Sequence, residues 1–268
     1  MVAHGLGLGA QVLLVLGAGG GEGGFAHHHL DAELGECGHL QRVVGQQPDA
    51  VHAQGPQHAG GRVVAARIWK VRVGRHGPQK FPLVLFLHGA GERGADNQAQ
   101  LKHGTSNFAK ADVREKFPCY VAAPQCSTGK SWNTQADVLV ELIADLQKQH
   151  RIDPDRIYVT GLSMGGFGTW ELLAQKPQLF AAAAPICGGG DPSKVAGYAS
   201  VPIWVFHGDK DTAVRPELSR AMVDALKKAG GSPKYTEYPG VGHDSWTATY
   251  SDPAFMEWMF AQKRNSSK

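Results

Sequence analysis

One serine of this chain stands in a setting that would make it a nucleophile. The stretch VTGLSMGGFGTW places Ser163 between Gly161 and Gly165, after an apolar run and before a helix-forming one. A serine on a strained turn from a buried strand into a helix exposes its hydroxyl, and flanking glycines let strand and helix pack closely. In a chain with 35 glycines this spacing alone is a weak signal, so its partners must decide.

A serine hydroxyl needs a general base, and the base needs an orienting carboxylate. PIWVFHGDKDTAV offers Asp209 and Asp211 just after an apolar run, and YPGVGHDSW offers His243 after a later one. The order Ser, Asp, His, with each residue at a strand end, predicts the catalytic triad Ser163, Asp211 and His243. Asp209 is the competing acid, but its position directly after the strand favours a turn-capping role.

Attack on a carbonyl also requires donors for the oxyanion that forms. The backbone N–H of Met164, next after the nucleophile, is expected to be one donor. LFLHGAGERG offers the other, from the backbone of Ala90 or Gly91; the family resemblance described below implies Ala90, which leaves Gly91 as a substrate-binding residue. We expect His88, and likewise His207, to shape its loop rather than act as a second base.

The elements needed to position these residues are visible as alternating strands and helices. Short apolar runs predict buried strands, and helical spacing of apolar residues predicts the helices between them. Such alternation predicts an α/β fold with a doubly wound, mostly parallel sheet flanked by helices. The expected strands are residues 62–73, 81–89, 116–125, 156–161, 180–188, 202–208 and 234–240, and the expected helices are residues 137–150, 167–177 and 216–231.

The ordered set of motifs resembles the α/β-hydrolase superfamily. It is similar to the bacterial carboxylesterases often labelled predicted peptidases, which are related to dienelactone hydrolases and to polyhydroxybutyrate-depolymerase-like or feruloyl esterases. The resemblance covers about residues 80–265 and implies the triad and the backbone oxyanion hole described above. Dienelactone hydrolases carry a cysteine nucleophile, whereas Ser163 favours ordinary ester hydrolysis. The motifs are LVLFLHGAGERG, VAAPQC, TGLSMGG, PICGGGD, VFHGDKDTAV and YPGVGHDSW.

The sequence also predicts an open site. PICGGGDPSKVAGYASVP leaves only an ordinary loop before the next strand, too short for a cap domain. An open site suits short acyl chains or esters on larger exposed molecules. Trp132 and Trp246 are candidates to line the substrate pocket, with core packing as the alternative for each. The triad supplies its own acid and base, so we expect no cofactor and no metal ion.

The first 61 residues differ from the rest. They contain no Ser, Thr, Lys, Ile, Asn, Tyr or Trp, and large side chains are scarce. We therefore expect a low-complexity leader over residues 1–61 that forms no domain of its own, followed by a catalytic domain over residues 62–268. The run GLGLGAQVLLVLGAGG weakly resembles a signal peptide but lacks basic residues before it, so secreted and cytoplasmic locations both stay open. The histidine run at residues 27–29 lacks partner ligands at zinc spacing, so we expect it to be a solvated run and not a metal site.

Composition excludes several other functions. The net charge is +3 and the basic residues are scattered, which argues against nucleic acid and anionic membranes as partners. The apolar runs are too short for a membrane-spanning helix. Four cysteines give no disulfide framework, although Cys119 and Cys126 could pair if the chain folds back between them.

These patterns predict a serine carboxylesterase that acts on a small-molecule ester through an acyl-enzyme. The enzymatic alternatives are a serine peptidase and a feruloyl or acetyl-polysaccharide esterase, each of which would use the same triad. A binding protein without activity on a hydrolase scaffold is the non-enzymatic alternative.

Overall fold

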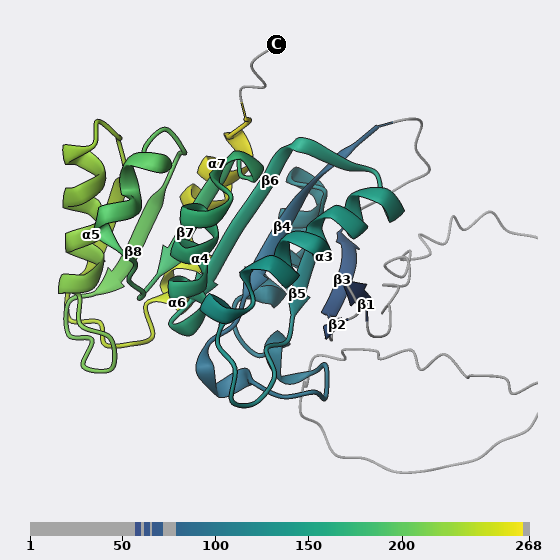
Figure 1. Cartoon of the computed structure of the whole chain (residues 1–268), viewed down its shortest axis with the longest axis horizontal. Helices are drawn as coiled ribbons and strands as arrows, with labels where there is room; N and C mark the ends of the chain where they lie inside the picture. Colours follow the sequence, from purple (N-terminus) through teal and green to yellow (C-terminus); the bar gives the residue numbers. More distant parts are fainter. Residues whose placement is uncertain (1–56, 60–61, 65, 72–78, 265–268) are drawn as a thin grey trace, which may run out of the picture. The chain divides into compact units, whose positions relative to one another are not determined.

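The computed structural model describes residues 57–59, 62–64, 66–71 and 79–264 (Figure 1). Its main feature is a seven-stranded sheet with the strand order β3-β5-β4-β6-β7-β8-β9. A separate antiparallel pair joins β1 to β2. The strands are β1 Gln57–Ala59, β2 Arg62–Val64, β3 Ala66–Val71, β4 Phe81–Leu87, β5 Cys119–Pro124, β6 Ile152–Leu162, β7 Ala182–Ile186, β8 Trp204–Gly208 and β9 Lys234–Tyr238.

The sheet is parallel except at one edge, where β3 runs antiparallel to β5. The predicted doubly wound, mostly parallel α/β-hydrolase sheet is therefore confirmed. The single strand predicted over residues 62–73 instead forms two elements, because β2 pairs with β1 whereas β3 pairs with β5. The predictions for residues 27–29 and for most of the leader lie outside the described residues.

Helices cover both faces of the sheet, and the alternation of side chains along β4 explains how. Leu83, Leu85 and Leu87 pack in one core with α3, α4 and α5, whereas Val84 and Phe86 pack in a second core with α1, α6 and α7. Figure 1 shows α3 and α4 lying across the first face. The α-helices are α1 Thr105–Phe108, α2 Ala111–Lys116, α3 Ala136–Gln149, α4 Met164–Gln175, α5 Glu217–Lys228, α6 Trp246–Ser251 and α7 Pro253–Ala261.

Short 3-10 helices fill several loops: η1 Ala90–Glu92, η2 Ala99–Leu101, η3 Trp132–Thr134, η4 Pro177–Leu179 and η5 Pro192–Gly197. Only η5 lies between β7 and β8, so the expected absence of a cap domain there agrees with the described chain. Within the residues that the structure describes, no helix has both the length and the apolar character needed to cross a lipid bilayer.

The strand order brings the site's loops together. The neighbours β4 and β6 are in register at Leu87 and Gly161, so the loop after β4 lies beside Ser163 at the end of β6. In open α/β sheets, ligands bind at the carboxyl ends of strands where the strand order reverses. The loops after β8 and β9 reach the same edge and carry Asp211 and His243.

Candidate active site

Ser163 lies on a sharp turn between β6 and α4. Its backbone has φ 53° and ψ −116°, a conformation that few residues with side chains adopt. The flanking glycines are required by contact: a Cβ on Gly161 would lie 2.5 Å from the Gly165 carbonyl oxygen, and one on Gly165 would lie 1.9 Å from the Leu87 carbonyl oxygen. Close approach of strand and helix therefore fixes glycine at both positions and leaves the serine side chain partly exposed.

A chain of hydrogen bonds joins the three residues predicted as the triad. The Ser163 hydroxyl Oγ lies 2.9 Å from Nε2 of His243, and Nδ1 of His243 lies 2.7 Å from Oδ2 of Asp211. With Nδ1 protonated, His243 donates to the carboxylate and Nε2 is left to accept the serine proton. The geometry is that of a serine, a base and an orienting acid.

The carboxylate of Asp211 is held by its own loop. Oδ1 accepts the backbone N–H groups of Ala213 and Val214, each at 2.9 Å, and the residue is 5% exposed. Burial alone would raise the pKa of Asp211. The hydrogen bonds from His243, Val214 and Ala213 outweigh burial and hold that pKa below its ordinary value, so the group is an anion at neutral pH.

Asp209 points elsewhere. Its Oδ1 accepts the backbone N–H of Gly240 at 2.6 Å, in the turn that leads from β9 toward His243. The neighbouring backbone bonds run from Asp209 N to the Tyr238 oxygen and from Lys210 N to the Val241 oxygen. Asp209 thus fastens two loops together and does not contact the imidazole.

His207 is a member of the site whose contacts could not be read from the sequence. Its ring is fully buried at the end of β8, with Nε2 2.8 Å from the Val214 oxygen and 3.2 Å from Oδ2 of Asp211. Because both groups only accept, Nε2 carries the hydrogen. Nδ1 lies 2.7 Å from the Ser219 hydroxyl, which is also 3.0 Å from the Gly188 oxygen. His207 therefore ties the loop of the acid to α5 and to the loop after β7.

The two expected oxyanion donors both occupy the first position of a helix, Ala90 in η1 and Met164 in α4. The first N–H groups of a helix have no intrahelical acceptor, so they are available to a ligand. Gly91 is exposed, and a Cβ there would meet nothing within 4 Å. His88 connects this loop to the segment after β5, because its Nε2 accepts the Cys126 N–H at 2.9 Å. Burial lowers the pKa of His88, which favours the neutral ring that can accept this bond.

The two candidate tryptophans lie in different places. Trp132 is 1% exposed, donates its indole N–H to the His88 oxygen at 2.9 Å and packs against Gly168, so it supports the oxyanion loop from within the core. Trp246 is only partly buried and stands perpendicular to the His243 ring, with 5.3 Å between ring centroids. Of the two, Trp246 borders the site.

A fully buried thiol lies beside the backbone of Ser163. Cys187 Sγ is 3.3 Å from the Ser163 backbone nitrogen, and its sulfur lies within 4.8 Å of ligand atoms of Asp211 and His243. Burial raises the pKa of Cys187 to about 12, so the thiol stays protonated, and the other two groups are already bonded to each other. This trio is therefore poorly suited to a metal ion. Cys119, Cys126 and Cys187 are all free thiols.

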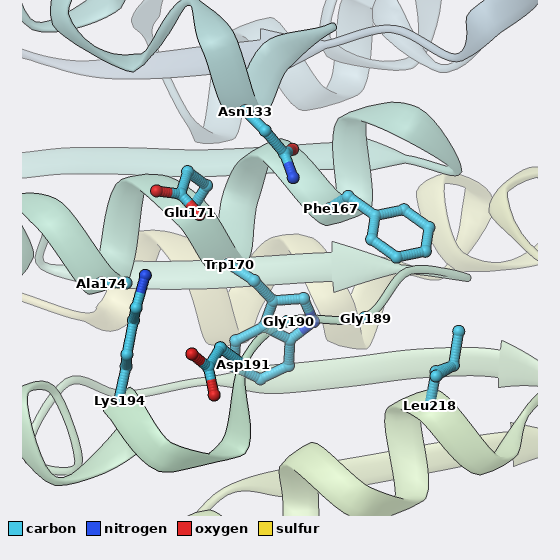
Figure 2. Close-up of a pocket in the computed structure, with 10 residues that line it drawn as sticks. All are labelled: Asn133, Phe167, Trp170, Glu171, Ala174, Gly189, Gly190, Asp191, Lys194 and Leu218. Atoms are coloured by element: carbon cyan, nitrogen blue, oxygen red, sulfur yellow. The ribbon is translucent and has the colours of Figure 1, made fainter.

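A pocket of about 290 Å³ opens along α4 (Figure 2). Its lining residue nearest to Ser163 in the sequence is Phe167, one helical turn further along α4, whose backbone N–H donates to the Ser163 carbonyl oxygen at 3.1 Å. Figure 2 shows Trp170 and Glu171 on the same helix and Leu218 on α5 opposite. The other lining residues are Asn133, Ala174, Gly189, Gly190, Asp191 and Lys194.

Comparison with known proteins finds a depolymerase, a carboxylesterase and an esterase among those similar to this chain. Poly(3-hydroxyalkanoate) depolymerase C of Paucimonas lemoignei is 34% identical over 127 residues, which is 42% of this chain and 29% of the relative. Carboxylesterase SOBER1 of Arabidopsis thaliana is 26% identical over 60% of this chain and 82% of its own length. A thermostable esterase crystal structure matches with a TM-score of 0.73 and 41% identity, covering 76% of this chain and 60% of that one.

The chain thus spans less than a third of the depolymerase and well under two thirds of several other relatives. A family model, by contrast, matches residues 113–258, which is more than half of the 268 residues and includes Ser163, Asp211 and His243. The chain belongs to the dienelactone hydrolase family.

Proposed function

We propose that the protein is a serine carboxylesterase that hydrolyses short-chain or small accessible carboxylic esters. The observation that carries this proposal is the unbroken chain of hydrogen bonds from the Ser163 hydroxyl through His243 to Asp211. His243 Nε2 takes the serine proton as Oγ attacks the ester carbonyl, and returns it to the leaving alcohol. Water activated by the same nitrogen then hydrolyses the acyl-enzyme.

The remaining groups fit this chemistry. The N–H groups of Ala90 and Met164 would donate to the oxyanion, and the positive end of α4 adds to them. We assign the acyl chain to the pocket beside Phe167, whose volume is at the small end of the range for ligand sites. Esterases among the relatives support the reaction class.

The test replaces Ser163 by alanine. Ser163→Ala should lose nearly all activity on p-nitrophenyl butyrate, by at least about 10³-fold, and should keep its fold by circular dichroism. Intact-mass analysis after fluorophosphonate treatment should show one adduct on the parent and none on the variant. Ser106→Ala, a change at an exposed serine of α1, serves as the control and should label like the parent. Equal labelling of Ser163→Ala would refute the assignment.

The substrate class needs its own measurement. A series of p-nitrophenyl esters of increasing acyl length should give the highest kcat/KM at short chains, because the pocket is small. Matched anilides separate an esterase from a peptidase, because a peptidase should hydrolyse the anilide at a rate comparable with that of the ester.

A further inference from the structure

Glu92, in η1 of the oxyanion loop, is a buried carboxylate whose ion-pair partner among the described residues is a histidine, which carries a charge only when protonated. The residue is 7% exposed, and among the ion pairs of the described residues it contacts only His103, whose Nε2 lies 3.7 Å from Oε1. Burying a carboxylate beside a partner that is neutral unless protonated costs free energy, because the anion loses its hydration. A site that keeps such a group next to a nucleophile is a candidate for binding a complementary ligand.

The carboxylate lies close to the reacting serine. A Cβ built on Gly89 would lie 3.0 Å from Oε2 of Glu92 and 3.7 Å from Cβ of Ser163. The space that a side chain on Gly89 would fill is therefore bordered by both the Glu92 carboxylate and Ser163.

An aromatic ring completes the surroundings. The ring of Trp246 lies 5.6 Å from the ring of His103 and 5.3 Å from that of His243, measured between centroids. Its indole nitrogen is buried and has no hydrogen-bond partner. Contacts therefore run from Ser163 through His243, Trp246 and His103 to Glu92. We call Trp246, His103 and Glu92 the Glu92 subsite.

The position of His243 tells which part of an ester this subsite faces. His243 returns its proton to the leaving oxygen, so the alcohol must lie on the imidazole side of the serine. Trp246 packs on that imidazole, and the pocket beside Phe167 lies along α4 instead. The Glu92 subsite thus borders the alcohol, and the α4 pocket accommodates the acyl chain.

Electrostatics identifies the group that the alcohol would carry. A negative charge near the oxyanion loop opposes the negative charge that develops on the substrate oxygen. A bound cation would cancel that opposition, pair with Glu92 and contact the face of Trp246. We propose that the Glu92 subsite binds the ammonium group of an ester whose alcohol part is an amino alcohol, an inference that rests on the proposed esterase function.

The test compares two esters of the same shape. 2-(Dimethylamino)ethyl butyrate is cationic at neutral pH, and 3-methylbutyl butyrate is its neutral isostere. The parent should prefer the cationic ester in kcat/KM. Glu92→Gln should lower kcat/KM for the cationic ester about tenfold to a hundredfold and raise it about twofold to threefold for the neutral one. Glu141→Gln, which removes a charge from an exposed position on α3, is the matched control and should leave the ratio as in the parent.

Equal loss on both esters, or an unchanged ratio, would show that Glu92 only holds the loop and would overturn the subsite. If Glu92→Gln does not fold, the parent decides: 2-(dimethylamino)ethanol should inhibit neutral-ester hydrolysis competitively and at least tenfold better than 3-methylbutanol, and equal inhibition would overturn the proposal. A parent that hydrolyses neither ester and takes no fluorophosphonate label would instead refute the proposed function itself.

Discussion

The side chains of Asp209 and Asp211 leave the end of β8 in different directions. Asp211 receives hydrogen bonds from His243 and from its own loop, whereas Asp209 accepts from Gly240 across the neighbouring turn. The two carboxylates are one residue apart in the sequence, so substituting each in turn separates orientation of the imidazole from support of the turn.

Asp211→Asn should lower kcat by about 10³- to 10⁴-fold with KM little changed, because an amide lets the imidazole settle in the wrong tautomer. Asp209→Asn should keep kcat within a few-fold of the parent and cost about 1 kcal/mol of unfolding free energy through its turn hydrogen bond. Steady-state kinetics with p-nitrophenyl butyrate measure kcat and KM of the two variants, and urea unfolding measures their free energies of unfolding. The assignment of the acid would be wrong if the kinetic losses were reversed.

That Ser163, Asp211 and His243 lie together could be predicted, because residues that follow neighbouring parallel strands meet at one edge of the sheet. Their catalytic roles, and those of Ala90 and Met164 as oxyanion donors, stay predictions.

The contacts of His207, Cys187 and Glu92 could not be predicted, since each depends on packing between segments far apart in the chain. His207, for example, contacts Ser219 on the next helix and Asp211 in the next loop. No spacing rule distinguishes a buried histidine of this kind from a solvated one.

At the scale of elements, the strands with continuous apolar runs were predicted well, because strands buried on both faces consist mainly of apolar residues. Helices α1, α2, α6 and α7 were not predicted. In α7, PAFMEWMFA, apolar residues occur on every side, so no helical stripe marks it, and its start is set by the Asp252 side chain that accepts the Ala254 N–H. The hairpin of β1 and β2 was missed because its pairing partner lay in the segment expected to form no domain.

An ion pair fastens α5 to the edge strand β9. The Arg220 guanidinium donates to both oxygens of Glu237, at 2.8 and 2.6 Å, and the Tyr235 hydroxyl donates to the same carboxylate. The hydrogen bonds from Arg220 hold the pKa of Glu237 at about 2. Glu217 meets the same arginine through a single hydrogen bond on the helix surface.

Glu237→Gln should therefore lower the free energy of unfolding modestly, because much of the pair is exposed to solvent. Since the pKa of Glu237 is depressed on folding, the contribution is complete above the ordinary glutamate pKa and is lost as the pH falls toward about 2. Urea unfolding at a series of pH values should show the parent and the variant converging in acid. Glu217→Gln should have the smaller effect near neutral pH; a larger one would contradict this account.

At the scale of the whole molecule, the question is where the folded domain must begin. The last strand on one side of the sheet, β3, pairs with β5 along its full length from Ala66 to Val71. Removing it would expose the backbone groups of β5 as a new edge, and such edges promote aggregation.

A chain truncated to begin at Arg62 keeps β3 and should remain folded, with the ester preference of the full chain. A chain truncated to begin at Lys80 lacks β3 and should be less stable and prone to aggregate. Thermal unfolding and size-exclusion chromatography compare the three proteins. An insoluble or inactive Arg62 truncation would show that the leader contributes to the domain.

The loop that carries His243 follows β9, the outermost strand on the opposite side of the sheet, whose strand neighbour in the described sheet is β8. Edge strands with partly exposed side chains open more readily than the central strands of a core. Each such opening would withdraw the imidazole from Ser163 while β4, β6 and α4 stay packed. We therefore expect the site to be lost by local opening of this edge at temperatures below that at which the domain unfolds.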